Sequence, residues 1–177
     1  MINHRLVNAL GFQVGWWACV SSVRLNLEAV ALIFCGLLVL AHLWFHQNRL
    51  TEIQLALGAW LLGLVIDSGL QYFSIIDFRG WALGPLSPFW LWMLWVLFAL
   101  TLNGSLHFFK HTPLALAAMS GAILGPVSYV AGAELGAATL AYTPFNLLLL
   151  STAWLVAMPV MVLFAKHISL KHTKGQT

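Results

Sequence analysis

Residues 61–72 have the sequence LLGLVIDSGLQY and lie inside an apolar run that extends from Ile53 to Ile76. A helix of this length crosses the hydrocarbon core of a bilayer, which is about 30 Å thick. Asp67 is the one acidic residue well inside such a run. A carboxylate at that depth costs about 2.5–3.5 kcal/mol on insertion scales, so it needs a partner, water or a proton. The stretch therefore predicts a membrane-spanning helix and a polar site within the membrane.

The composition extends this conclusion to the whole chain. Of its 177 residues, 61% are hydrophobic and 7% are charged, and the mean hydropathy is +0.89. Soluble domains carry about 25% charged residues, so a water-soluble fold is excluded. The two cysteines, Cys19 and Cys35, fall in apolar runs and are interpreted as small core residues. We expect a single transmembrane domain over residues 1–177.

Six apolar runs predict an all-α, polytopic membrane helical bundle with about six transmembrane helices. The expected helices cover residues 6–22, 29–45, 53–76, 88–109, 113–133 and 145–165, followed by a basic tail over 166–177. In this arrangement both termini share one side with Arg5, Arg49, Lys110, Lys166, Lys171 and Lys174, and the other side has Arg24 and Arg79. The positive-inside rule then predicts that both termini are cytoplasmic.

Polar side chains inside the predicted helices give the candidate site residues. Asp67 and Gln71 are four residues apart, so they share one helix face. Asp67 either lines a cavity, as a proton acceptor, substrate anchor or counter-ion, or locks its helix to a neighbour such as Tyr129. The catalytic candidates are Asp67, Asn103 and Tyr129, and the substrate-binding candidates are Asn8, Gln71, Thr101 and Ser105. The alternative for the Asn103 group is hydrogen bonding between helices alone.

Two histidine pairs have a spacing of four residues, which places two imidazoles one helical turn apart. They are His42 with His46, and His107 with His111. This spacing occurs in metal sites, so the four residues are candidate ligands. The favoured interpretation is that they are interfacial histidines beside lipid headgroups, so no metal and no other cofactor is expected. The sequence also lacks the glycine-rich motifs that bind nucleotides.

Several stretches resemble the DUF2878 family of bacterial membrane proteins. They are Leu6-Val7-Asn8 with Phe12-Gln13 and Gly15-Trp16, the stretch around Asp67, the segment from Leu97 to Leu106 with Thr101-Leu102-Asn103-x-Ser105, and Gly125-Pro126-x-x-Tyr129. The resemblance covers nearly the whole chain. It implies a multi-pass protein of the inner membrane of Gram-negative bacteria. It also implies a lipid-related role, since such genes lie near genes for fatty-acid or phospholipid modification.

These observations leave three functions open. The favoured one is a lipid-related enzyme or accessory subunit with a polar intramembrane site around Asp67. The alternatives are a small proton-coupled transporter and a structural or assembly partner without activity of its own, so whether the chain is an enzyme is undecided. The expected partners are membrane lipids and either a partner membrane protein or further copies of the chain. Nucleic acid is not expected, because there is no basic globular face.

Overall fold

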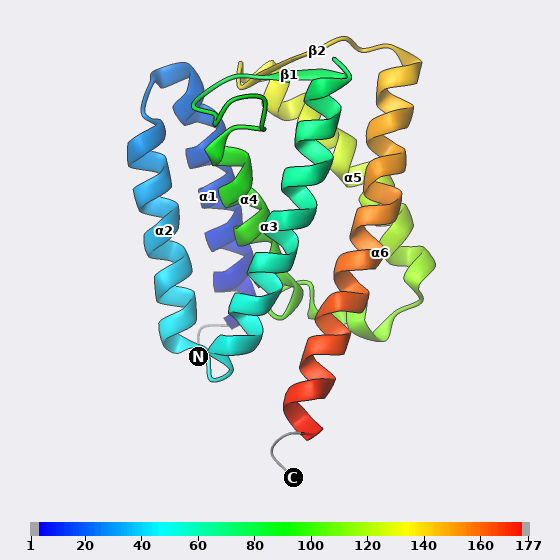
Figure 1. The fold of residues 1–177 in the computed structure, drawn as a ribbon. Coiled ribbons are helices and arrows are strands. Elements are labelled where there is room, and N and C mark those ends of the chain that lie inside the picture. Colours follow the sequence, from blue (N-terminus) through cyan, green and yellow to red (C-terminus); the bar gives the residue numbers. More distant parts are fainter. Residues whose placement is uncertain (1–3, 175–177) are drawn as a thin grey trace.

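A computed structural model describes residues 4–174, with side chains as far as residue 170 (Figure 1). The helices are α1 (His4–Leu25), α2 (Glu28–Phe45), α3 (Arg49–Tyr72), α4 (Phe89–Leu102), the short 3-10 helix η1 (His107–His111), α5 (Leu114–Glu134) and α6 (Pro144–Lys174). Two strands, β1 (Ile76–Phe78) and β2 (Ala138–Leu140), pair antiparallel, with Asp77 opposite Thr139. The predicted all-α helical bundle is confirmed, and the strands form a small cap on it.

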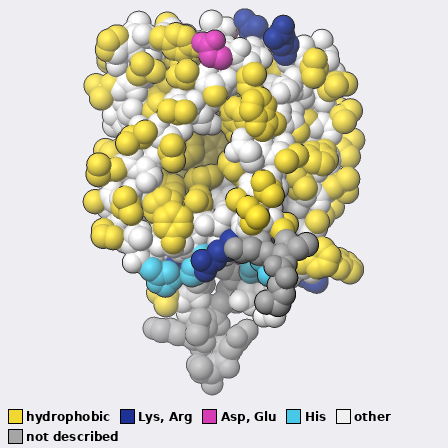
Figure 2. Space-filling model, turned by 180° about the vertical axis from the view of Figure 1, so that it is seen from behind, with side chains coloured by type: hydrophobic (Ala, Val, Ile, Leu, Met, Phe, Trp, Pro, Cys, Tyr) yellow, Lys and Arg dark blue, Asp and Glu magenta, His cyan; other side chains and the backbone are white. Residues whose placement is uncertain are grey.

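The helices form a bundle in which α4 is central. Five of them, α1, α2, α3, α5 and α6, are long and apolar enough to cross a membrane. The shorter α4 has 14 residues and packs against α1, α2 and α3, with further contacts to α6. Large apolar side chains such as Val65 and Ile33 are exposed on the outside of the bundle. Apolar side chains cover most of the face drawn in Figure 2. This surface has the chemistry of a lipid-facing exterior.

The bundle has two ends of different composition (Figure 1). We call the end with β1 and β2 the strand end, and the end with the α2–α3 turn and η1 the histidine end. The first turn of α1 and the last turns of α6 also lie at the histidine end (Figure 1). At the strand end, the buried carboxylate of Glu28 accepts the backbone N–H of Trp81 at 2.8 Å and so holds the loop before α4.

The fourth predicted helix, 88–109, is too long: α4 ends at Leu102. Asn103 and Gly104 are weak helix formers. The side chain of Asn8 on α1 also accepts the backbone N–H of Ser105 at 2.9 Å, so that group is not available to continue the helix. The chain turns at this point and re-forms a helical turn only in η1.

Two other predicted boundaries also differ. Helix α3 covers Arg49–Tyr72 rather than 53–76. It ends early because Ser74 adopts a positive φ of 54°, which reverses the chain into β1, as in common helix-ending motifs. The basic tail expected from residue 166 begins as helix, because α6 continues to Lys174 and buries Ile168 on the way.

Close helix contacts depend on glycines that face aromatic rings. A Cβ at Gly63 of α3 would lie 2.2 Å from the ring of Trp95, and one at Gly125 of α5 would lie 2.2 Å from Trp154. A Cβ at Gly121 would lie 2.5 Å from the backbone oxygen of Trp154. The small residues spaced by four along α5 therefore form the face that packs against α6.

Candidate functional site

Asp67 is fully buried in α3 and accepts two hydrogen bonds from neighbouring helices. Its Oδ2 accepts the indole N–H of Trp95 on α4 at 2.7 Å, and its Oδ1 accepts the hydroxyl of Tyr129 on α5 at 2.5 Å. Asp67 therefore joins three helices at one point. The described residues place no cation against its carboxylate, and both of its partners are neutral aromatic groups.

The position of Trp95 follows from a glycine one turn before Asp67. Because Gly63 has no side chain, the indole of Trp95 lies flat against α3 and its N–H reaches the carboxylate. On its other side, Trp95 stacks on Trp154 of α6, with ring centroids 4.9 Å apart and an angle of 9° between the planes. The packing of Trp95 on Gly63 therefore sets its hydrogen bond to Asp67, and these three residues form one structural unit.

An apolar cavity of about 70 Å³ reaches this unit from the side of the bundle. Its walls come mainly from α1, α4 and α5, with aromatic side chains Phe12, Trp16, Phe78, Trp90, Trp95, Phe98, Tyr129 and Trp154. A hollow is visible in the apolar surface on this side (Figure 2). At the rim, Trp16 donates its indole N–H to Ser128 at 3.0 Å and so bridges α1 and α5. The lining includes Trp95 and Tyr129, the two groups that bind Asp67.

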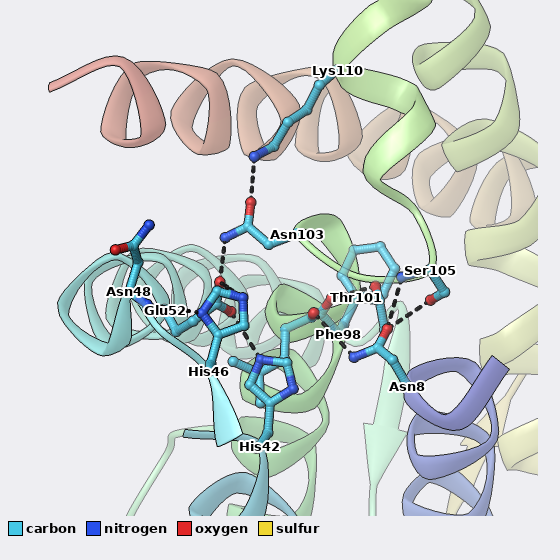
Figure 3. Close-up of polar contacts among 11 residues, drawn as sticks. Asn8, His42, His46, Asn48, Glu52, Phe98, Thr101, Asn103, Ser105 and Lys110 are labelled. Atoms are coloured by element: carbon cyan, nitrogen blue, oxygen red, sulfur yellow. Dashed lines mark hydrogen bonds and ion pairs between the residues drawn. The ribbon is translucent and has the colours of Figure 1, made fainter. Parts of the chain in front are cut away.

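A second fully buried carboxylate, Glu52, lies at the histidine end in the first turn of α3 (Figure 3). Its Oε2 is 3.2 Å from Nε2 of His42, and its Oε1 is 3.4 Å from Nε2 of His46. The two imidazoles are stacked, with ring centroids 5.3 Å apart and an angle of 18° between the planes. The short turn between α2 and α3 brings these three groups together.

The network around Glu52 continues to α4, η1 and α6. Asn103 donates its side-chain N–H to Oε1 of Glu52 at 2.6 Å and accepts a hydrogen bond from Lys110 (Figure 3). Lys110 also donates to Ser169 of α6 at 2.9 Å. Partial burial lowers the pKa of Lys110 from its ordinary value, while the charge of Glu52 acts in the opposite direction.

His107 lies beside this network among positive groups. Its pKa is lowered, first by partial burial and then by the nearby charges of Lys110, His111 and Arg5. The rings of His107 and His111 have centroids 5.0 Å apart. This pair has the same sequence spacing as His42 and His46, but no contact between it and a carboxylate is found among the described residues.

The structure divides the predicted site residues between the two ends. Asp67 and Tyr129 are in direct contact, whereas the third catalytic candidate, Asn103, belongs to the Glu52 network. Of the substrate-binding candidates, Asn8 accepts the hydroxyl of Ser105 at 2.8 Å, also at the histidine end.

The remaining candidates lie outside both carboxylate sites. Thr101 donates its hydroxyl to the backbone of Phe98 in its own helix. Gln71 contacts neither Asp67 nor Glu52 among the described residues, and its side-chain oxygen has no hydrogen-bond partner there.

The two cysteines, Cys19 on α1 and Cys35 on α2, place their sulfur atoms 3.5 Å from each other.

Sequence reasoning missed Glu52 and Trp95. In the sequence, Glu52 is an acidic residue near the start of a predicted helix. The usable signal is its position directly across a short turn from two histidines spaced by four residues. Trp95 is one of nine tryptophans in the chain, and nothing in its local sequence distinguishes it from Trp90 or Trp92.

Comparison with known families agrees with the architecture. Residues 5–160 match the family model described as a protein of unknown function, DUF2878. No curated protein and no solved structure matches the chain. Because the matched segment covers most of the sequence, the chain belongs to the DUF2878 family.

Proposed function

We propose that this protein binds a lipid-derived molecule in the cavity between α1, α4 and α5 and acts as a lipid-related enzyme or accessory subunit. The observation that carries the proposal is that an apolar cavity is lined by both Tyr129 and Trp95, whose polar hydrogens bind Asp67. Apolar pockets with a few convergent polar groups are the usual form of small-molecule sites.

The dimensions of the cavity favour part of a chain rather than a whole lipid. A space of about 70 Å³ accommodates a short segment of an acyl or isoprenoid chain, with the remainder extending through the opening into the bilayer. Aromatic walls provide a large apolar contact area. The indole nitrogen of Trp154, buried at the cavity and without a hydrogen-bond partner among the described residues, is available to an oxygen of the ligand.

The roles of the polar groups follow from their positions. Tyr129 lines the cavity and so contacts the ligand directly, whereas Asp67 lies behind it and orients the Tyr129 hydroxyl and the Trp95 indole. If the reaction requires a proton at the ligand, Tyr129 exchanges it with Asp67. The excess of Lys and Arg on the side of the termini supports an orientation with the histidine end in the cytoplasm of a bacterial inner membrane.

Gly132 allows a sharp test of the cavity. It is buried on α5 and lines the cavity, yet a Cβ at this position would meet no atom within 4 Å. Gly132→Leu therefore adds an apolar side chain to the cavity lining from a position where its first carbon meets no neighbour. Gly36→Leu, on α2 and also free of neighbours within 4 Å, is the matched control away from the cavity.

The experiment combines binding and lipid analysis. The protein is purified from its own membrane and analysed by native mass spectrometry, and a deletion strain is complemented with each variant before its lipids are profiled. We expect wild type and Gly36→Leu to retain a bound lipid and to restore the lipid profile, and Gly132→Leu and Tyr129→Phe to fail in at least one of these. Equal lipid retention and equal complementation by Gly132→Leu would overturn the proposal. If the lipid is retained but the deletion changes no lipid, the lipid-related activity is rejected.

A further inference from the structure

We propose that His42, His46 and Glu52 bind a divalent transition-metal ion, with Zn²⁺ the best fit, at the histidine end of the bundle. This site is separate from the cavity at Asp67 and independent of the lipid-related function. One ligand atom from each of the three side chains lies within 4.8 Å of the others. Two imidazoles and one carboxylate form a donor set that zinc uses in catalytic sites.

Each imidazole already lies close to one oxygen of the carboxylate. With bonds of about 2.0–2.2 Å from Zn²⁺ to nitrogen and oxygen, adjacent ligand atoms in a tetrahedron are roughly 3.3–3.6 Å apart. His42 Nε2 is 3.2 Å from Oε2 of Glu52, and His46 Nε2 is 3.4 Å from Oε1, the other oxygen of the same carboxylate. Since one ligand atom from each side chain lies within 4.8 Å of the others, the three side chains have to draw closer together to hold one ion between them.

The ligands lie on the two sides of the short α2–α3 connection. His42 is in the last turn of α2, His46 is the residue directly after that helix, and Glu52 is in the first turn of α3. The carboxylate is fully buried, while the side chains of His42 and His46 are 20% and 34% exposed. An ion can therefore reach the carboxylate past the imidazoles, and three protein ligands would leave a fourth position for water, as in catalytic rather than structural zinc sites.

The groups around the ligands are arranged to orient them. Asn103 donates to Oε1 of Glu52 at 2.6 Å, and Lys110 holds Asn103 from the far side. Such outer contacts commonly change metal affinity by 10–100-fold when removed. Arg49, the nearest basic residue in the α2–α3 turn, is directed away and donates to the backbone oxygen of Trp44 at 3.2 Å.

Metal binding requires a proton to move on each imidazole, because Nε2 of His42, like that of His46, faces an oxygen of Glu52. The backbone N–H of Asn48 approaches Nδ1 of His46 at 3.3 Å, an arrangement in which Nε2 carries the imidazole proton toward Glu52. When Nε2 binds an ion, the proton of the neutral ring moves to Nδ1 and the long contact with Asn48 is lost. Imidazole ligands favour Zn²⁺, Cu²⁺, Ni²⁺ and Co²⁺ over Mg²⁺ and Ca²⁺, which select all-oxygen sites.

The test uses the full chain in nanodiscs after removal of metal with a chelator. Zn²⁺ affinity is measured by competition with a chromophoric chelator, and Co²⁺ is added separately to record its visible absorption, which reports tetrahedral coordination. The variants are His42→Ala, His46→Ala and Glu52→Gln. His107→Ala and His111→Ala are the matched controls, because that pair has the same spacing without a carboxylate contact.

We expect one equivalent of Zn²⁺ for wild type and for both control variants, and at least a tenfold loss of affinity in His42→Ala and His46→Ala. Circular dichroism and the elution profile establish that each variant is folded. His46 is partly exposed, so its variant keeps the test decisive even if Glu52→Gln does not fold. The proposal is overturned if wild type binds no stoichiometric Zn²⁺, or if the controls lose as much affinity as the ligand variants. The first of these outcomes would leave the cluster as contacts between Glu52 and the two imidazoles alone.

Discussion

Two fully buried carboxylates on the same helix are stabilised in opposite ways. Glu52 and Asp67 are 15 positions apart on α3, or about 22 Å along an α-helix. Glu52 is surrounded by two imidazoles and by an amide that binds a lysine. Asp67 is bound by a phenol and an indole, neither of which carries positive charge.

The difference indicates what each end of the molecule can bind. A buried anion is expensive unless charge or hydrogen bonds compensate for its lost hydration. At Glu52 cationic groups can supply that compensation, and a metal ion can take their place. At Asp67 the compensation comes from neutral donors that also line an apolar cavity, which suits an uncharged, lipid-derived ligand. The predictions below test this contrast, in order of decreasing effect.

The largest effect on stability is expected at Glu52. Glu52→Ala removes the one carboxylate in the network and leaves Asn103 and Lys110 without their anionic partner, at a cost of about 3–5 kcal/mol, as for other broken buried pairs. The measurement is the denaturation midpoint in detergent micelles. Asp77→Ala, at an exposed carboxylate in β1, is the control. Similar denaturation midpoints for Glu52→Ala and Asp77→Ala would show that the contacts of Glu52 do not stabilise the histidine end.

A smaller effect is expected at Asp67. Asp67→Asn preserves the size of the side chain but turns an amide N–H toward one of two donors, which costs about 1–3 kcal/mol. If the donor left unpaired is Tyr129, the double variant Asp67→Asn with Tyr129→Phe recovers part of this loss, because no buried hydroxyl remains. Strict additivity of the two substitutions would show that the Asp67–Tyr129 contact contributes no coupling energy.

Gly104→Ala tests the polar contact between α1 and α4 at the histidine end. A Cβ at Gly104 would lie 2.4 Å from Oδ1 of Asn8, which is held by hydrogen bonds to Ser105 and Leu100. We expect a loss of about 1 kcal/mol from overpacking. The penalty should disappear when Asn8→Ala is also present. Gly69→Ala, with no neighbour within 4 Å, should be neutral or stabilising.

The smallest effect is a pH dependence at His107. Its pKa in the folded protein is below the usual value of about 6.5, so protonation favours the unfolded chain. This contribution to stability is complete above pH 6.5 and is lost as the pH falls through the folded-state pKa. The apparent melting temperature of wild type should therefore fall more steeply between pH 7 and pH 5 than that of His107→Gln. If the melting temperatures of wild type and His107→Gln fall equally with pH, protonation of His107 does not destabilise the folded protein.

Much of the fold could be predicted from the chain because the bilayer imposes simple rules. Long apolar runs must form helices, and the expected number and order of helices agree with the structure. The boundaries were less accurate where side chains from another helix compete for backbone groups. The end of α4 is the main example, since it depends on Asn8, almost a hundred residues earlier.

The candidate sites were predicted in part. The depth of Asp67 made it a candidate from its own sequence context, and Tyr129 was correctly expected as a neighbour. The histidine pairs were noticed, but their spacing could not distinguish the pair that meets a carboxylate from the pair that does not. That distinction depends on the angle at which α3 follows α2, which local sequence does not report.

The amino-acid sequence is sufficient to identify a helical membrane protein with a carboxylate inside one helix, because hydropathy and charge are properties of each residue in turn. Which groups surround each of the two fully buried carboxylates depends on how the helices pack. Gly63 has to meet Trp95 before the indole can reach Asp67, and the α2–α3 turn has to bring His42 and His46 to Glu52. These contacts are made between helices, and their formation depends on close packing and on the orientation of side chains, neither of which appears in a linear pattern.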